Sequence, residues 1–175
     1  GDCPACNQGR LPYCFNLNQY NMSGGRPDGT AAFVDADGVR VNSHFFGQSS
    51  FASHSIVAET SCVKIDPSYD LRKLGPLGCG IQTGAGAILN TLQVEPGSSV
   101  VIAGAGALGL SAVMAAKVAG AGTIVAIDRH ANRLELAERY GATATLSPSP
   151  DQLAATIHAA SGGGAYSRMA AIVCA

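Results

Sequence analysis

A glycine-rich turn between an apolar run and an alanine-rich segment constrains the fold of this chain more than any other feature. The stretch from Gly104 to Gly109 reads GAGALG, which is the pattern G-x-G-x-x-G. It follows an expected strand at 99–103 and opens an expected helix at 107–118, which is the context that gives the pattern its meaning. We expect Gly104 to form the tight turn, Gly106 to let the backbone approach a pyrophosphate, and Gly109 to allow close helix–strand packing.

An acidic residue follows at the place that a dinucleotide site requires. Asp128 ends the next apolar run, 123–127, at about the 20-residue distance where a carboxylate takes the adenosine ribose hydroxyls. Such a carboxylate repels the 2′-phosphate of NADP, so the sequence favours NAD. Arg129 is a competing phosphate clamp, but Asp128 would still occupy the 2′ position. The alternative is a glycine-rich packing turn beside an ordinary exposed Asp. Because strand, glycines, helix, second strand and Asp follow one another in the required order, the sequence favours dinucleotide binding.

The pattern of the chain changes near residue 80. Residues 1–80 are loop-rich and predict an irregular β domain, whereas residues 81–175 alternate strands and helices and predict part of a doubly wound parallel Rossmann sheet. The fold class is therefore α/β. In the first part we expect short strands at 31–34, 39–41, 50–58 and 63–65. In the second we expect strands at 99–103, 123–127, 144–146 and 170–174, with helices at 76–92, 107–118, 132–140 and 151–160.

Three of the six cysteines are clustered at metal-ligand spacing. Cys3 and Cys6 form a C-x-x-C pair, and Cys14 follows after a short loop. Tetrahedral Zn²⁺ takes four thiolates or imidazoles, and closely spaced cysteines on a loop satisfy it. A natural fourth ligand would precede Gly1, so we interpret the chain as a fragment. Inert buried thiols and a redox pair are the alternatives; a polar stretch disfavours the first, and Pro12 disfavours the helix that the second needs.

Charge and composition exclude several classes of partner. The 175 residues carry a formal charge of −1 without a basic block, which argues against nucleic acid. No apolar run reaches the roughly 18 residues of a membrane span. Clustered cysteines fit metal sites in a reducing cytoplasm better than a disulfide framework, so we expect a cytoplasmic protein.

Four stretches together resemble the zinc-dependent medium-chain alcohol dehydrogenases, most closely the branch that acts on aryl or benzyl alcohols. They are GDCPACNQGRLPYC at 1–14, HFFGQSSF at 44–51, GPLGCGIQTG at 75–84, and 104–109 with Asp128. The resemblance covers nearly the whole chain and fades after the glycines at 162–164. It implies a partial GroES-like catalytic domain at 1–80 and a partial NAD-binding domain at 81–175.

The resemblance also implies roles that chemistry alone would not reveal. Cys3, Cys6 and Cys14 are similar to three ligands of a structural zinc. Cys79 is similar to one ligand of a catalytic zinc, whose other two ligands belong to a segment ahead of this sequence. A lone Cys between glycines would otherwise be interpreted as a packing residue. Because one thiolate cannot hold a catalytic ion, we expect the isolated chain to be inactive and assign no catalytic residue.

Three further residues are placed at the cofactor by the same resemblance. Thr83 and Leu108 match positions that contact the nicotinamide side, and Arg133 matches a basic residue near the adenosine ribose. The implied cofactors are Zn²⁺ and NAD, and the implied substrate is a small primary alcohol, aromatic in this branch, that is oxidised to the aldehyde. The resemblance further implies a homo-oligomer.

Two other functions compete with the dehydrogenase. One is a non-catalytic module that binds dinucleotide and zinc; the other is a zinc-loop interaction protein, which leaves the glycine turn and Asp128 unexplained. The remaining cysteines and histidines are interpreted as structural or exposed residues: Cys62, Cys174, His44, His54 and His158.

Overall fold

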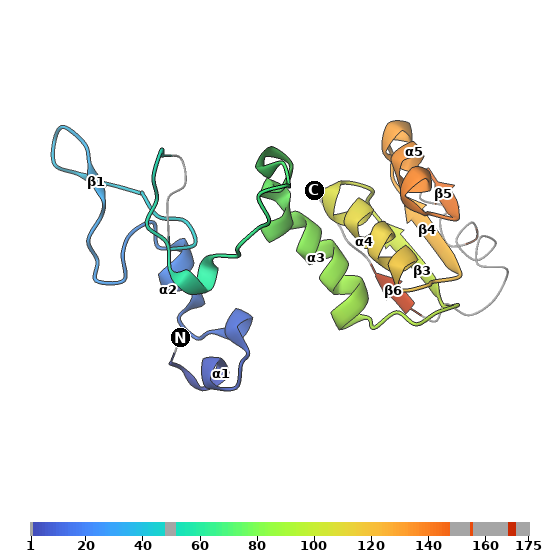
Figure 1. Cartoon of the computed structure of the whole chain (residues 1–175), viewed down its shortest axis with the longest axis horizontal. Helices are drawn as coiled ribbons and strands as arrows, with labels where there is room; N and C mark the ends of the chain where they lie inside the picture. Colours follow the sequence, from blue (N-terminus) through green and yellow to red (C-terminus); the bar gives the residue numbers. More distant parts are fainter. Residues whose placement is uncertain (1, 48–51, 148–154, 156–167, 171–175) are drawn as a thin grey trace. The chain divides into compact units, whose positions relative to one another are not determined.

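The computed structural model describes residues 2–47, 52–147, 155 and 168–170 (Figure 1). The chain divides into two compact units, Gly1–Pro67 and Ser68–Ala175. No helix in the described part of the chain has the length and apolar character needed to cross a bilayer. The sequence-based boundary at 80/81 stays a prediction; by contacts, the short helical turns that lead into the second unit lie with that unit.

The first unit consists of short elements joined by turns. Its helical segments are α1 (Pro4–Asn7), α2 (Leu17–Met22) and two 3₁₀ turns, Leu11–Tyr13 and Glu59–Ser61. Strands β1 (Phe33–Val34) and β2 (Arg40–Val41) pair antiparallel, as expected from the sequence between them.

The turn of this hairpin is built by one aspartate and one glycine. The Asp35 carboxylate accepts hydrogen bonds from the amides of Asp37 and Val39, and Gly38 adopts a φ of +78° that suits glycine. By contrast, the strands expected at 50–58 and 63–65 are wrong in the described residues, which are irregular there. Val63 is 84% exposed, so its apolar pattern reflects no buried sheet face.

The second unit contains a four-stranded parallel sheet of order β5-β4-β3-β6. Strands β3 (Ser99–Ala103), β4 (Thr123–Ile127) and β5 (Ala144–Leu146) have the predicted bounds. Strand β6 (Arg168–Ala170) begins before the predicted strand 170–174, of which residues 171–174 lie outside the described part. The strand order reverses between β3 and β6, which is where doubly wound sheets bind ligands.

Two of the helices of this unit follow the sequence closely. Helix α4 (Ala107–Val118) matches its predicted bounds, and α5 (Ala131–Tyr140) starts one residue early and ends before Gly141, whose φ is +128°. The helix expected at 151–160 lies outside the described residues except for position 155.

The helix predicted at 76–92 is divided into three pieces, and this expectation is corrected. The pieces are a 3₁₀ turn at Gly75–Gly78, helix α3 at Gly80–Gly86 and a π-helical turn at Ala87–Thr91. Another 3₁₀ turn, Leu71–Lys73, precedes them. Cys79 has φ −136° and ψ −82°, which no α-helix accommodates. The helix therefore begins after this residue.

The core of the second unit lies on both faces of its sheet. Val100, Ile102 and Ile124 pack with Ile88 and with residues of α4 and α5 on one face. Val101, Val125 and Ile127 form a second cluster on the other face with Ala144 and Leu146. Burial on both faces explains the continuous apolar runs of β3 and β4.

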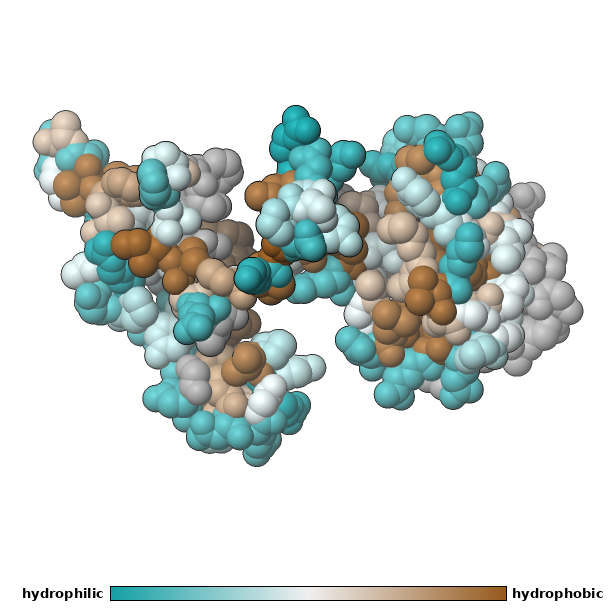
Figure 2. Space-filling model, in the orientation of Figure 1, coloured by the Kyte–Doolittle hydropathy of each residue, from teal (hydrophilic) through white to brown (hydrophobic). Residues whose placement is uncertain are grey.

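The first unit has much less of a core. The buried apolar residues in its described part are Ala5 and Cys6. Many of its large apolar side chains lie at the surface, and Figure 2 shows brown apolar patches over this unit. Local turns and the cysteine cluster therefore contribute much of its organisation.

Candidate dinucleotide and metal sites

The glycine turn joins β3 to α4 and has the shape that its sequence predicts. Gly104 has φ +93°, a conformation that suits glycine, and its amide donates to the Ile127 carbonyl oxygen at 2.7 Å. Gly106 is the extended residue before α4. A β-carbon at Gly109 would overlap the Gly104 carbonyl oxygen, so only glycine lets the helix approach the turn this closely.

Asp128 lies at the end of β4 and is 8% exposed, so it is not the ordinary exposed aspartate of the alternative interpretation. Its Oδ2 accepts a hydrogen bond from the Ala105 amide at 2.7 Å, and its Oδ1 accepts one from the His130 amide at 2.9 Å. Arg133 Nη1 lies 3.7 Å from Oδ2. Asp128 thus contacts the turn and the first part of α5 at once.

The environment of Asp128 keeps its carboxylate ionised. Burial alone would raise the pKa of Asp128, but the His130 and Ala105 amides and the Arg133 charge outweigh burial and lower the pKa. Arg133, from the first turn of α5, forms an ion pair with this carboxylate, although its own side chain is 46% exposed. The structure thus brings together Asp128, Arg133 and the glycine turn.

Helix α3 packs tightly on α4, and the two helices run side by side in Figure 1. Gly80 lies next to the Leu108 side chain, since a β-carbon at Gly80 would meet Leu108 Cδ1 at 3.6 Å. The Ser111 hydroxyl on α4 donates to the Ile81 carbonyl oxygen on α3. This packing places the beginning of α3 beside the beginning of α4, where the glycine turn ends.

Thr83 and Cys79 lie at this end of α3. The Thr83 hydroxyl donates to the Cys79 carbonyl oxygen at 2.7 Å, and both residues are exposed. The structure therefore brings Thr83 and Leu108 to neighbouring helix ends. In the described residues no group of three His, Cys, Asp or Glu side chains includes Cys79. Cys79 alone does not fit a complete catalytic metal site.

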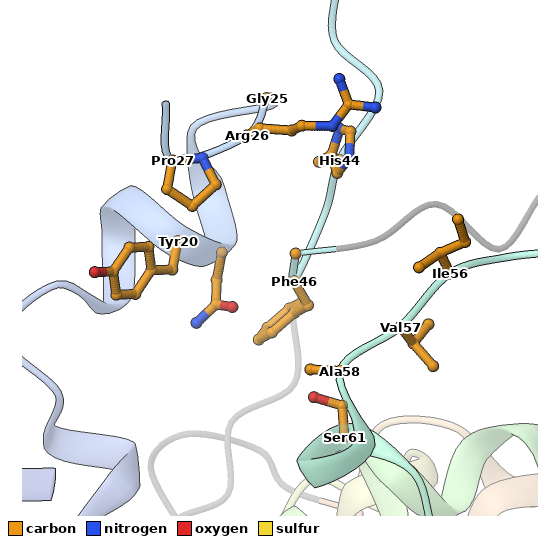
Figure 3. Close-up of a pocket in the computed structure, with 12 residues that line it drawn as sticks. Tyr20, Gly25, Arg26, Pro27, His44, Phe46, Ile56, Val57, Ala58 and Ser61 are labelled. Atoms are coloured by element: carbon orange, nitrogen blue, oxygen red, sulfur yellow. The ribbon is translucent and has the colours of Figure 1, made fainter. Parts of the chain in front are cut away.

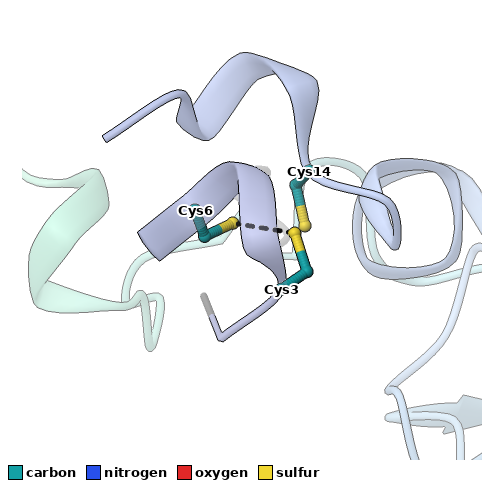
Figure 4. Close-up of side chains that lie close together, drawn as sticks. All are labelled: Cys3, Cys6 and Cys14. Carbon is teal, nitrogen blue, oxygen red and sulfur yellow. Dashed lines mark hydrogen bonds between the residues drawn. The ribbon is translucent and has the colours of Figure 1, made fainter. Parts of the chain in front are cut away.

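Cys3, Cys6 and Cys14 converge at the beginning of the first unit (Figure 4). Their Sγ atoms lie within 4.8 Å of one another, and those of Cys3 and Cys6 are 3.5 Å apart. Zinc–sulfur bonds of about 2.3 Å in a tetrahedron place sulfurs about 3.8 Å apart. The three thiols thus fit one ion. They are the one such cluster found in the described part of the chain.

Local backbone geometry builds this cluster and sets its protonation. Pro4 starts α1 directly after Cys3, and Gly9 turns the chain back with a φ of +75°. Backbone hydrogen bonds, first from Phe15 and then from Cys6, lower the pKa of the Cys3 thiol to about 6. The hydrogen bond with Cys3 and burial raise the pKa of Cys6. The cluster therefore holds a thiolate, the form that binds metal.

A hollow of about 710 Å³ in the first unit was not anticipated from the sequence (Figure 3). Tyr20 and Phe46 line it, with Arg26 and His44 at one side and Ile56 at the other. The residues come from segments far apart in the chain, so no sequence pattern could have indicated it. His44 Nδ1 lies 3.0 Å from the Ser43 hydroxyl, in agreement with a structural histidine.

Comparison with known proteins places this geometry in a family. Residues 107–173 match the family model described as zinc-binding dehydrogenase. The chain is 43% identical to a geraniol dehydrogenase of Castellaniella defragrans, over 94% of this chain and 44% of the relative. It is 40% identical to an S-(hydroxymethyl)glutathione dehydrogenase of Escherichia coli, over 85% of this chain and 40% of that relative. The chain spans about half the length of the curated relatives it matches.

Solved structures give the same result. A zinc-binding-domain alcohol dehydrogenase protein from Burkholderia ambifaria superposes with a TM-score of 0.89 at 43% identity, covering 98% of this chain and 46% of that one. The benzyl alcohol dehydrogenase of Acinetobacter calcoaceticus superposes with a TM-score of 0.77 at 45% identity, covering 91% and 43%. The folds therefore agree over both units.

Proposed function

We propose that this chain, which belongs to the zinc-dependent alcohol dehydrogenase family, is part of an enzyme that transfers hydride from a primary alcohol to NAD. The observation that carries the proposal is the buried, ionised Asp128 beside the glycine turn at the reversal of the strand order. A dinucleotide that binds there would place its pyrophosphate at the beginning of α4 and its adenosine ribose at Asp128.

Asp128 supports NAD over NADP. Its carboxylate has lone pairs left for the ribose hydroxyls after it accepts two amide hydrogen bonds. The same negative charge would face the 2′-phosphate of NADP. Arg133 balances part of this charge from 3.7 Å but is already engaged with the carboxylate. Rejection by like charge typically lowers affinity by about 10- to 100-fold.

Two zinc sites, one structural and one catalytic, are part of this proposal. A zinc ion at Cys3, Cys6 and Cys14 would cross-link a unit that has little core of its own. A catalytic zinc, when bound, polarises the substrate oxygen and lowers its pKa. Cys79 is proposed as one of its ligands and Thr83 and Leu108 as contacts of the nicotinamide end, because all three lie where α3 meets α4.

The substrate, the assembly and the location are also part of the proposal. A relative of solved structure is named for benzyl alcohol, and the sequence resembles the aryl-alcohol branch, so we propose an aromatic primary alcohol. The relative named for geraniol, a non-aromatic primary alcohol, makes that class the alternative. We propose that the enzyme is a cytoplasmic homo-oligomer whose partners are small alcohols and aldehydes rather than nucleic acid or membrane.

Titration of both cofactors tests the cofactor assignment. The protein should bind NAD about 10- to 100-fold more tightly than NADP, and Asp128→Ser should narrow or reverse this ratio. Glu135→Gln on the exposed part of α5 is the matched control, since it removes an equal charge away from the turn. An unchanged ratio in Asp128→Ser would remove Asp128 from the ribose site.

A second candidate is a non-catalytic module that binds NAD and zinc. The isolation of Cys79 from other ligands in the described residues favours it for this chain by itself. A gene that also encodes the Cys and the His needed to complete the catalytic zinc site would favour the enzyme and separate the two. For the purified chain, an assay with benzyl alcohol, NAD and added Zn²⁺ tests the expected inactivity, and turnover at about 1 s⁻¹ or more would contradict it. NAD binding without turnover is expected of this chain under both candidates.

A further inference from the structure

We propose that Asp128 is also a positioning residue that holds the glycine turn in its phosphate-binding shape. This inference rests on the proposed dinucleotide site but is separate from ribose recognition. It assigns the carboxylate a role in the free protein, before any cofactor arrives.

The turn is bonded to the end of β4 through two consecutive amides. The Gly104 amide donates to the Ile127 carbonyl oxygen, and the Ala105 amide donates to Asp128 Oδ2, each at 2.7 Å. Ala105 is fully buried, so its amide has no access to bulk water. Asp128 therefore supplies the acceptor for a buried donor in the middle of the turn, where an unmet donor would be costly.

These two bonds determine which amides remain for a phosphate. Helix α4 begins after Gly106, and the Gly106 carbonyl accepts the first helical bond from Leu110. With the amides of residues 104 and 105 engaged, the donors left for a phosphate are the amides of the first turn of α4, which have no acceptor within the helix. The Asp128 bond thus orients the donors that would meet a pyrophosphate.

The geometry requires a carboxylate rather than an amide at position 128. Two amides, from Ala105 and His130, donate to the two different oxygens of Asp128. An asparagine has one oxygen, and its NH₂ group would face one of these donors. A serine is too short to replace both bonds. Any neutral replacement therefore loses at least one of the two hydrogen bonds, even without cofactor.

A nucleotide without ribose hydroxyls separates the two roles of Asp128. The probe is 2′,3′-dideoxyadenosine 5′-diphosphate, compared with ADP, against the whole chain and Asp128→Asn. If Asp128 holds the turn, the variant should bind the dideoxy probe roughly 10- to 150-fold more weakly, the effect of one lost hydrogen bond to a charged group. Removing a negative charge should by itself strengthen binding of an anion, so weakening cannot come from charge.

Unchanged or tighter binding of the dideoxy probe by Asp128→Asn would overturn the inference. A second variant keeps the charge: replacing Ala105 by lactic acid through semisynthesis removes only the amide donor. This variant should bind the dideoxy probe more weakly than the wild type, by a similar factor. Glu135→Gln should leave both nucleotides unaffected.

Hydrogen exchange of the Ala105 amide tests the inference in the free protein. Asp128→Asn should speed exchange at Ala105 at least about tenfold, the effect of one broken hydrogen bond, while the buried Val113 amide of α4 keeps its protection. Equal protection of Ala105 in both proteins would refute the role. If the wild-type chain binds neither nucleotide, the proposed function fails, and this exchange measurement still decides whether Asp128 holds the turn.

Discussion

Gly84 of α3 lies so close to Leu108 of α4 that a β-carbon at position 84 would overlap the Leu108 carbonyl oxygen. The hydrogen bond from Ser111 to Ile81 joins the same two helices. Backbone-to-backbone contact and a polar bond together fix the beginning of α3 against the glycine turn. The proposed contacts of the nicotinamide end depend on this helix pair.

Gly84→Ala should destabilise the second unit by about 1–3 kcal/mol, because the new methyl group forces the helices apart. Gly86→Ala is the matched control. Gly86 has helical φ and ψ, and its β-carbon would meet only Asn90 Nδ2 at 3.8 Å. The control should be neutral or slightly more stable, since alanine favours helix. Thermal unfolding followed by circular dichroism checks this, and equal midpoints for both variants would contradict the close contact.

Thr143→Val should cost about 1–2 kcal/mol of unfolding free energy. The Thr143 hydroxyl accepts from the Ile124 amide at 2.8 Å and donates to the Ile124 carbonyl oxygen at 3.1 Å, at the beginning of β4. Thr145→Val is the control, because that hydroxyl bonds only the exposed Glu138 carboxylate among the contacts described for it. Urea denaturation compares the two; a larger loss in Thr145→Val would show that the Thr143 bonds contribute little.

Asp128 should make the stability of the second unit dependent on pH in the acid range. Its folded-state pKa lies below the ordinary value of 3.8, so its contribution is present above that value and is lost as pH falls through the folded-state pKa. The gap in unfolding free energy between the wild type and Asp128→Asn should be constant from about pH 8 to pH 5 and shrink below about pH 4. Urea denaturation across this range measures it. A gap that stays constant at pH 3 would show that the amides and Arg133 do not favour the charged form.

Cys3 should be the first cysteine labelled in the metal-free chain. A thiol with a pKa of about 6 is largely thiolate at pH 7, and Cys3 is half-buried rather than enclosed. Brief treatment with iodoacetamide at pH 7 should modify Cys3 several-fold faster than Cys62, roughly three- to tenfold after allowing for the lower nucleophilicity of such a thiolate. Peptide mass spectrometry gives the order of labelling.

Added Zn²⁺ should protect Cys3, Cys6 and Cys14 together and leave the exposed Cys62 reactive. Cys14→Ser should abolish joint protection, whereas Cys62→Ser should not. Equal labelling of all four residues with and without zinc would exclude the metal assignment.

Much of the second unit could be predicted because its signals are local. The glycine turn, the bounds of α4 and β4, and the end of α5 at Gly141 could be predicted from periodicity, from composition and from single glycines, which readily adopt a positive φ. The first unit was harder. Its hairpin was predicted from a turn sequence, but the strands at 50–58 and 63–65 were not formed in the described residues, because short apolar runs without a sheet partner remain irregular.

The sequence by itself determined the strand and helix segments of the second unit, the cysteine spacing and the residue types at the cofactor turn, since each depends on residues close together in the chain. Only the tertiary structure decided that Asp128 is buried against the Ala105 amide and that Arg133 Nη1 lies 3.7 Å from its carboxylate. It also decided that Gly84 sets the contact between α3 and α4. The contacts of Asp128 with Ala105 and of Gly84 with Leu108 join residues more than 20 positions apart, and packing alone determines which distant backbone groups come within bonding distance.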